Sequence, residues 1–473
     1  MSSRLSPSLA VLVLSSFAGC GGERQRCEGP DTTATVSVSR HFDGSYEGVQ
    51  ALVALPDGDI LVAGGLADAR PPDSDAPNVS GGRPMIGRVD SEGEIVARRD
   101  FGEGDGVVRA VALGVDGGLF MAGSTGEPSI TLKNVLENAT PGPYFFPSLA
   151  FAARLDPSTL EPLWDFGLAG EFDRFAVVAD TAGGVVVGGQ STNATDRKTD
   201  AYLAGLDRQS GALQWELRVV SDRDARVVGL AAAPSGDVVA AISVLGAVQE
   251  GVTAPLPTFG DSVGATLLLA LDPATGTERW AKILGDGTAE GSSLGPRAFV
   301  GAADGTLALA GVAGSGLALG LGEVPGGAIA VRLDAQGEPL AQHTFTSDGP
   351  IDVGAIAFAG DGGLLVGGDF SVGSFGSVLR VDGRASEPTV KDTSIAGYVA
   401  GFSPSDEVRF AYVLPAVDNV QPGDAGIIEV TAVAPGAEGS VMVGARLSGI
   451  AHLASCDERS SENGDALILR IDP

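Results

Sequence analysis

The chain has 473 residues, of which 70 are glycine and 27 are proline, and hydrophobic residues make up 44% of it. This composition is too apolar for a disordered chain and is typical of many short strands joined by turns. The formal net charge of -30 argues against a nucleic-acid partner, because contacts to phosphates need clusters of lysine and arginine.

The beginning of the chain has the pattern of an export signal. Arg4 supplies a basic residue, residues 9–14 form an apolar core, and small residues follow. The apolar stretch is too short to remain as a membrane-spanning helix, which takes about 20 residues. We therefore predict that residues 1–19 are a signal peptide.

The end of this signal resembles the bacterial lipobox, in the residues FAGC at positions 17–20. That resemblance implies that Cys20 is lipidated and becomes the mature N-terminus, followed by a polar tether over residues 20–32. Gly21 stands where an aspartate would indicate inner-membrane retention, so the outer membrane or the cell surface is favoured. A secreted protein with an incidental Cys20 is the alternative.

Two further cysteines, Cys27 and Cys456, lie near opposite ends of the exported chain. Disulfides persist in an exported compartment, so these two cysteines are candidates for a disulfide that closes almost the whole chain into one loop. Two unrelated thiols are the alternative.

The rest of the chain repeats one hairpin, seen most clearly at residues 353–369, VGAIAFAGDGGLLVGGD. Two apolar runs flank an Asp-Gly turn, as expected of buried strands joined by a turn that requires a positive φ. The turn glycines recur 53 to 77 residues apart, which indicates a repeat architecture. They are Gly58, Gly117, Gly183, Gly236, Gly305, Gly362 and Gly439.

A second, more polar hairpin follows each first one, as at residues 85–102 and 328–345. Two hairpins make a four-stranded antiparallel sheet, which is the blade of a β-propeller. We predict an all-β domain over residues 33–473, a single propeller of seven four-stranded blades. Residues 371–415 contain two candidate hairpins; 397–414 is taken as the outer pair and 377–391 as an insertion, and an eighth, partial blade is the alternative.

The two ends of the domain complete each other. The last repeat stops after its third strand. Residues 36–42 resemble the fourth strand of a repeat, but no first, second or third strand precedes them. We predict that residues 36–42 pair with residues 466–471, so that the N-terminal strand completes the C-terminal blade and the ring closes without a free sheet edge.

The segments between inner and outer hairpins vary most, and in an antiparallel blade they all emerge at one end. Loops on a rigid scaffold commonly carry binding sites, so this end is the predicted working surface; tolerated surface insertions are the alternative. The segments are residues 67–83, 126–148, 245–264 and 448–464.

RLDAQGEPL at residues 332–340 and VALPDGDILVAGG at 53–65 resemble bacterial surface β-propeller repeat proteins with repeats of about sixty residues. The resemblance covers nearly all of residues 33–473 and implies an exported propeller without an assigned activity. ALDPATGTERW at 270–280 is similar to the docking motif of quinoprotein-like propellers. That similarity implies that tryptophans on outer strands staple neighbouring blades, and the candidates are Trp164, Trp215 and Trp280.

Few residues point to chemistry. The adjacent cysteine pair of many quinone-dependent dehydrogenases is missing, and the isolated His41, His343 and His452 form no zinc signature. His41 and His343 are predicted to be surface residues. The aspartates that end the third strands are predicted to cap turns: Asp90, Asp156, Asp207, Asp272, Asp334 and Asp472. No catalytic residue, cofactor or metal site is assigned; calcium binding by residues 457–465 stays open.

These observations favour a non-enzymatic, monomeric, lipid-anchored propeller of a bacterial envelope that binds a protein or glycan partner. It would contact the membrane only through its N-terminal lipid. One alternative is an extracytoplasmic enzyme that acts on polysaccharide or another secreted substrate through loop carboxylates. A second is an outer-membrane assembly scaffold.

Overall fold

The structure is a computed structural model, and the predicted signal peptide and Cys20 lie outside the residues that it describes. In that described part, no helix is both long and apolar enough to cross a membrane. The described residues are 27–28, 35–42, 48–66, 83–90, 94–101, 106–125, 149–169, 172–192, 198–254, 256, 264–285, 293–322, 324–372, 376–385, 395–414, 416–417, 426–448, 450–453, 456–459 and 465–472.

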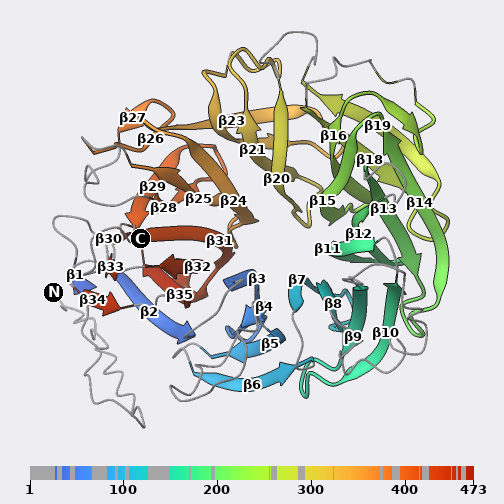
Figure 1. Ribbon diagram of the computed structural model, residues 1–473, viewed down its shortest axis with the longest axis horizontal. Coiled ribbons are helices and arrows are strands. Elements are labelled where there is room, and N and C mark those ends of the chain that lie inside the picture. The colour runs from blue at the N-terminus through green and yellow to red at the C-terminus, as the bar shows by residue number, and fades with distance from the viewer. Residues whose placement is uncertain are drawn as a thin grey trace, which may run out of the picture.

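The strands form mostly antiparallel sheets arranged in a ring, and each four-stranded group has one edge strand nearest the centre (Figure 1). The all-β propeller prediction is therefore confirmed at the level of fold class. The first blade is β3 (Gly48–Ala54), β4 (Ile60–Leu66), β5 (Arg83–Val89) and β6 (Ile95–Asp100). The second is β7 (Gly106–Leu113), β8 (Leu119–Thr125), β9 (Leu149–Leu155) and β10 (Pro162–Ala169).

Three more sheets form separate blades. The third is β11 (Phe172–Thr181), β12 (Gly184–Thr192), β13 (Thr199–Leu206) and β14 (Leu213–Ser221), extended by β17 (Val248–Glu250). The fourth is β15 (Asp224–Ala232), β16 (Val238–Leu245), β18 (Gly264–Leu271) and β19 (Glu278–Leu284). The fifth is β20 (Leu294–Gly301), β21 (Leu307–Ala313), β22 (Gly327–Leu333) and β23 (Pro339–Thr346).

The remaining strands of the ring form one nine-stranded sheet, the joined sheet. Its first group is β24 (Ile351–Phe358), β25 (Leu364–Ser371), β28 (Ile395–Phe402) and β29 (Val408–Leu414). Its second group is β31 (Ile427–Pro435), β32 (Val441–Ser448), β35 (Asp465–Asp472), β2 (Thr35–Phe42) and β1 (Cys27–Glu28). A 3-10 turn, η1 (Ala437–Gly439), lies between β31 and β32.

The prediction of seven four-stranded blades is wrong. Five sheets stand as separate blades, whereas β28 and β31 pair in parallel at Ile395 and Ile427 and so join two antiparallel groups into one hydrogen-bonded sheet. The repeated turn glycines report hairpins along the chain, but they carry no information on hydrogen bonds between neighbouring groups. The number of separate sheets therefore did not follow from the repeat.

Two local predictions are confirmed. Strand β2 pairs antiparallel with β35, from Val36 opposite Ile471 to Phe42 opposite Ala466, so the N-terminal strand completes the last group. The hairpin of β26 (Arg380–Val381) and β27 (Arg384–Ala385) is an insertion that extends the outer edge of β23, and β28 with β29 forms the outer pair of its own group. A separate three-stranded sheet is formed by β30 (Ala416–Val417), β33 (Ile450–Leu453) and β34 (Cys456–Arg459).

A glycine of the second strand sits where the first strand approaches most closely. A Cβ atom at Gly368 would lie 2.2 Å from the main-chain oxygen of Asp352, and one at Gly64 would lie 2.2 Å from that of Gly48. A Cβ atom at Gly123 would lie at the same distance from the main-chain oxygen of Val107. The Gly-Gly signature of the repeat therefore reflects packing between two strands, since any side chain there would overlap backbone.

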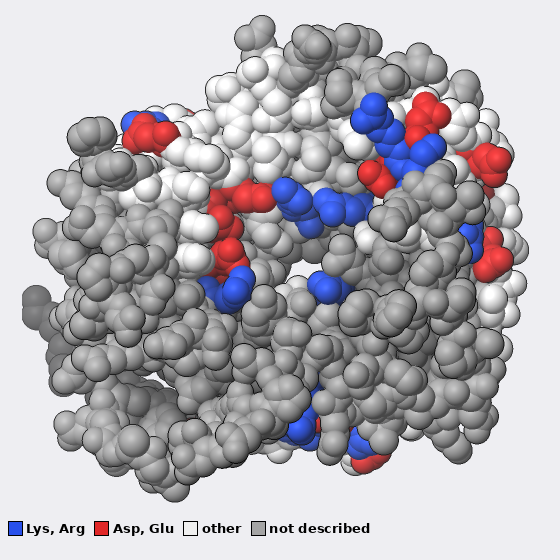
Figure 2. All heavy atoms as spheres, viewed as in Figure 1, with Lys and Arg blue, Asp and Glu red and all other residues white. Residues whose placement is uncertain are grey.

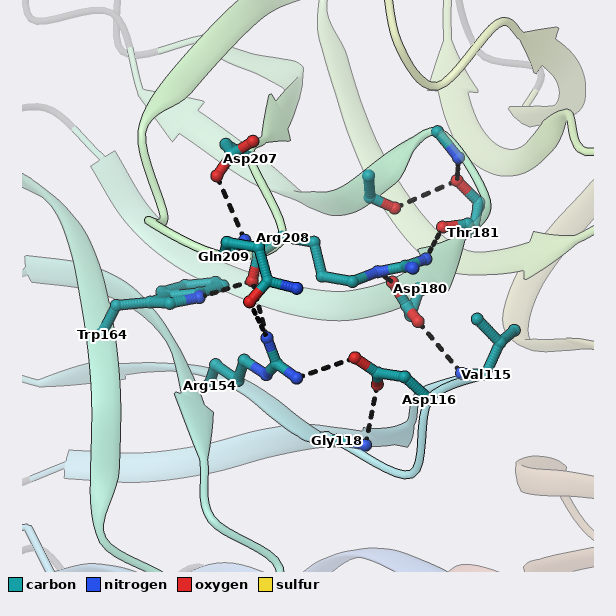
Figure 3. Close-up of polar contacts among 12 residues, drawn as sticks. Val115, Asp116, Gly118, Arg154, Trp164, Asp180, Thr181, Asp207, Arg208 and Gln209 are labelled. Atoms are coloured by element: carbon teal, nitrogen blue, oxygen red, sulfur yellow. Dashed lines mark hydrogen bonds and ion pairs between the residues drawn. The ribbon is translucent and has the colours of Figure 1, made fainter.

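Tryptophans connect neighbouring blades, as the quinoprotein-like motif implied. Trp164 on β10 is 4% exposed, and its Nε1 donates to the main-chain oxygen of Arg208 at 2.8 Å (Figure 3). Trp215 on β14 donates in the same way to Pro273, at 2.7 Å. Gly337 lies against Trp280, since a Cβ there would be 3.4 Å from the indole. The prediction that these tryptophans pack between blades is confirmed.

Five of the six turn aspartates also behave as predicted. Asp156 accepts hydrogen bonds from the amides of Ser158 and Thr159 at 2.8 and 3.0 Å, and these bonds lower the pKa of its carboxyl. Corresponding amide bonds reach Asp90, Asp207, Asp272 and Asp334. Asp472 differs, because it accepts from the side chain of Arg470 at 2.9 Å.

Candidate functional site

Seven strands lie innermost in the ring, and each carries a β-bulge at a corresponding position. The residue before the bulge packs into the sheets, as with Val108, Val353 and Val430, which are at most 1% exposed. A bulge turns the next side chain in a new direction, which is how the rims of sheets place functional groups. The bulged residues are Gln50, Arg109, Ala176, Val228, Arg297, Gly354 and Thr431.

These bulges lie near the start of each innermost strand, away from the Asp-Gly turns. Gly48 at the start of β3 pairs with Gly65, and the next residue of β4, Leu66, pairs with Arg83 across the loop of residues 67–82. The bulges and the variable loops are therefore at the same end of the ring. The loops of residues 67–82 and 126–148 themselves lie outside the described residues.

Charged side chains surround a hollow at the centre of this end (Figure 2). We call it the charged end and define it by Arg109, Arg226, Arg297, Asp352 and Glu429. Arginines come from β7, β15 and β20, and carboxylates come from the adjacent β24 and β31. The three arginines of this set thus come from one part of the ring, the arginine sector, and its two carboxylates from the next part, the acidic sector.

A cavity of about 230 Å³ lies in the arginine sector. Arg109, Arg226 and Arg297 line it together with Gln190, and the other described lining residues are Ala, Gly, Val and Pro. No Asp or Glu is among the lining residues that the structure describes. The described part of the lining therefore combines three arginines and one glutamine with small and apolar residues.

An ion pair fixes the boundary between the two sectors. Nε of Arg297 lies 3.2 Å from Oδ1 of Asp352, and Nη2 lies 3.1 Å from Oδ2, so the two side chains meet in the forked geometry that arginine and carboxylate prefer. Further round the rim, Arg446 on β32 lies 3.3 Å from Glu429.

Asp369 on β25 is the most perturbed carboxyl of the acidic sector. Burial raises its pKa to about 6, and the nearby charges of Glu429 and Asp352 add to the rise, while Arg297 opposes it. Tyr398 stands beside it, fully buried, and its hydroxyl donates to the main-chain oxygen of Asp352 at 3.0 Å. Burial, with Asp369 and Asp352, raises the pKa of Tyr398 well above its usual value. Asp369 can thus exchange a proton near neutral pH.

The described residues contain no group of three His, Cys, Asp or Glu side chains arranged to hold a metal ion. Residues 457–465 are the calcium candidate. The structure describes part of their backbone and none of their side chains. The side chains of Cys27 and Cys456 are likewise outside the description, although their strands β1 and β34 are placed. The disulfide remains a prediction.

His343 corrects a prediction, because it is buried and not a surface residue. Only 2% of it is exposed, its ring stacks on Phe402, and its Nδ1 lies 2.9 Å from Oδ2 of Asp382. Its Nε2 lies 3.6 Å from Oδ1 of Asp406. The reason is the inserted hairpin β26–β27, which pairs with β23 and removes the solvent-exposed edge that the sequence implied. The side chains of His41 and His452 lie outside the described residues.

Sequence reasoning did not single out Arg109, Arg226, Arg297 or Asp369. A usable signal exists, because an arginine precedes the apolar run in VVRAVALG, DARVVGLAA and GPRAFVGA, at the corresponding end of three hairpins. Only the ring closure brings those three positions to one cavity.

The chain matches no protein-family model and no curated protein. Among solved structures it is similar to the WD40 β-propeller domain of Doa1, with 12% identity, a TM-score of 0.44 and 92% of this chain and 96% of that one covered. The Dos1 propeller is 10% identical, with a TM-score of 0.44 and with 92% of this chain and 94% of that one covered. A virginiamycin B lyase from Staphylococcus aureus is 9% identical, with a TM-score of 0.43 and with 93% of this chain and 99% of that one covered. At these values the comparisons assign no activity, and the likeness to bacterial surface repeats remains a prediction.

Proposed function

We propose that this protein is a monomeric binding scaffold of the bacterial envelope, held by a lipid on Cys20, that binds a protein or glycan partner at the charged end of its ring. The observation that carries the proposal is the convergence of Arg109, Arg226 and Arg297 on one cavity. Grouping three arginines in a chain of net charge -30 concentrates positive charge at one place on an acidic molecule.

The rest of the fold supports this use. The sheets around the cavity are packed against one another, and the arginines stand on strands, which hold side chains more precisely than loops do. The variable loops leave the strands at the same end, where they would enlarge the contact surface. A rigid ring with a charged rim and adjacent loops is suited to hold a partner.

The test is capture of envelope components by the full-length protein in two double variants. Arg297→Ala with Asp352→Ala removes an ion pair at the charged end, and Arg409→Ala with Asp361→Ala removes one at the Asp-Gly turns. Neither pair of substitutions changes the net charge. A stoichiometric partner retained by the control and lost from the charged-end variant supports the proposal, whereas equal behaviour of both contradicts it.

The lipid anchor has its own experiment. Cys20→Ser should move the protein from the membrane fraction to the soluble envelope fraction, since one lipid-modified residue supplies the attachment. Unchanged fractionation would refute the anchor and leave the binding proposal standing.

One observation favours a second candidate, an extracytoplasmic enzyme. A carboxyl with a pKa of about 6, such as that of Asp369, suits general acid–base chemistry near neutral pH. Turnover of a secreted polysaccharide that is abolished by Asp369→Asn, with folding retained, would establish this function in place of the scaffold.

A further inference from the structure

We infer that the cavity among Arg109, Arg226 and Arg297 binds a single oxyanion group, a carboxylate or a phosphate, on a small polar ligand. The inference rests on the proposed function, because it names the chemistry that the charged end would recognise. It concerns a defined site, and it can be tested without knowledge of the partner.

The first step is the geometry of the donors. Arg109 stands on β7, Arg226 on β15 and Arg297 on β20, so three different sheets each contribute an arginine to the lining of one cavity of about 230 Å³. Gln190 on β12 also lines it. A guanidinium is a planar fork of N–H donors that matches the oxygens of carboxylates and phosphates, which makes arginine the preferred side chain for both.

The second step is the position of Arg297. Asp352 accepts from its Nε and Nη2 and holds the guanidinium in place. These two contacts use only part of the five N–H donors of an arginine. Asp352 is not among the described residues that line the cavity, so it orients Arg297 without filling the space.

The charge of the protein limits how many anionic groups the ligand can carry. The chain carries 60 acidic residues against 30 basic ones, and Asp352 and Glu429 occupy the neighbouring sector of the rim. A long polyanion would extend beyond the arginines over a molecule of net charge -30 and would be repelled. One oxyanion group on a small polar molecule can accept hydrogen bonds from the arginines and avoids that repulsion.

The experiment is calorimetric titration of the purified full chain at constant ionic strength, with three probes: inorganic phosphate, D-glucuronate and neutral D-glucose. Saturable one-site binding of phosphate, glucuronate or both is expected, without binding of glucose. The anion that binds more tightly identifies the chemical source of the group. Absence of saturable binding by both anions overturns the inference.

Variants separate the cavity from the general charge of the protein. Arg226→Gln should weaken binding at least about tenfold, which is the loss expected for one charge-assisted hydrogen bond. Arg409→Gln makes the same change in net charge at the exposed Asp361 pair near the Asp-Gly turns, and it should leave affinity unchanged. Equal weakening by both variants overturns the inference. Arg109→Gln replaces Arg226→Gln if the latter fails to show a normal thermal transition.

The outcomes are distinct from those of the proposed function. Partner capture that depends on the charged end, without binding of either anion, overturns the oxyanion site alone. If anion binding is lost in Arg226→Gln but the charged-end variant captures its partner as wild type does, the oxyanion site stands and the scaffold proposal is refuted.

Discussion

Asp352 on β24 and Asp369 on β25 are direct partners across an antiparallel pair, so two carboxyl side chains occupy opposing positions on adjacent strands. Like charges in this arrangement destabilise a sheet. The protein accommodates them in two ways. Arg297 neutralises Asp352 with two hydrogen bonds, and the pKa of Asp369 rises to about 6, so that this carboxyl is partly protonated near neutral pH.

The free energy of unfolding of Asp369→Asn, compared with that of wild type at the same pH, should rise as pH increases. Between pH 3.8 and about 6, folded Asp369 retains a proton that the unfolded chain has released, so wild-type stability falls through this window. Glu429 and Asp352 strengthen the effect and Arg297 weakens it. The variant should gain on the order of 1–3 kcal/mol on wild type across the window, measured by urea unfolding at pH 4 and pH 7.5.

Asp207→Asn is the control for that measurement. Hydrogen bonds from the side chain and amide of Ser210 lower the pKa of the Asp207 carboxyl. Its contribution to stability is therefore present above pH 3.8 and is lost only as pH falls below that value, so the stability of this variant relative to wild type should stay nearly constant between pH 4 and pH 7.5. A gain by Asp207→Asn as large as that of Asp369→Asn over this range would contradict the assignment for Asp369.

Gly368→Ala should destabilise the protein by at least about 2 kcal/mol, because the new Cβ would lie 2.2 Å from the main-chain oxygen of Asp352. Gly360→Ala is the matched control in the same hairpin, since a Cβ there meets nothing within 4 Å. It should change stability by less than about 1 kcal/mol. Comparison of the two midpoints in urea tests the role assigned to the Gly-Gly signature, and equal midpoints would refute it.

Trp164→Phe should lower stability by about 1–3 kcal/mol, because it removes the hydrogen bond to Arg208 and leaves space between the second and third blades. Leu163→Ala, at a neighbouring position that is 59% exposed, is the control and should have a smaller effect. Circular dichroism during thermal unfolding reports both. If Leu163→Ala proved as damaging as Trp164→Phe, the tryptophan would not be the contact that joins the blades.

Deletion of residues 33–44 should destabilise the whole ring. The deletion removes β2, which is the partner of β35 along its length. Hydrogen exchange should then accelerate in β35 and also in β3, because β31 of the same sheet contacts β3 through a hydrogen bond from Thr431 to the main-chain oxygen of Val49. Faster exchange confined to β35, with unchanged cooperative unfolding elsewhere, would show that closure is local.

Local signals in the sequence predicted the local structure well. The Asp-Gly turns and most of the third-strand aspartates act through neighbours in the same turn, so their roles could be inferred from the residues alone. Trp164 bonds to Arg208 in the next blade, and its role was implied by the resemblance to quinoprotein-like propellers. The strand β2 was inferred from the residues as well, because an incomplete last repeat requires a partner. Such inferences depend on the sequence of one repeat and need no knowledge of the assembled ring.

Features produced by assembly could not be inferred in this way. Arg109, Arg226 and Arg297 are far apart in sequence and meet only when their sheets lie side by side in the ring. His343 lies on a strand with an ordinary edge pattern, and the hairpin that buries it is an insertion outside the repeat. The parallel pair at Ile395 and Ile427 is a single contact between groups, which no strand pattern encodes.

The pairing of β2 with β35 also sets the order of events during folding. The strand that closes the ring is among the first parts of the domain to be synthesised, and its partner is among the last. Strand β2 must therefore wait unpaired while the other sheets form, and contacts between such distant segments are slow to form. We expect the final step of folding to be a slow docking of the N-terminal strand. Until it docks, the open edge of β35 is the part of the protein most exposed to pairing with another chain.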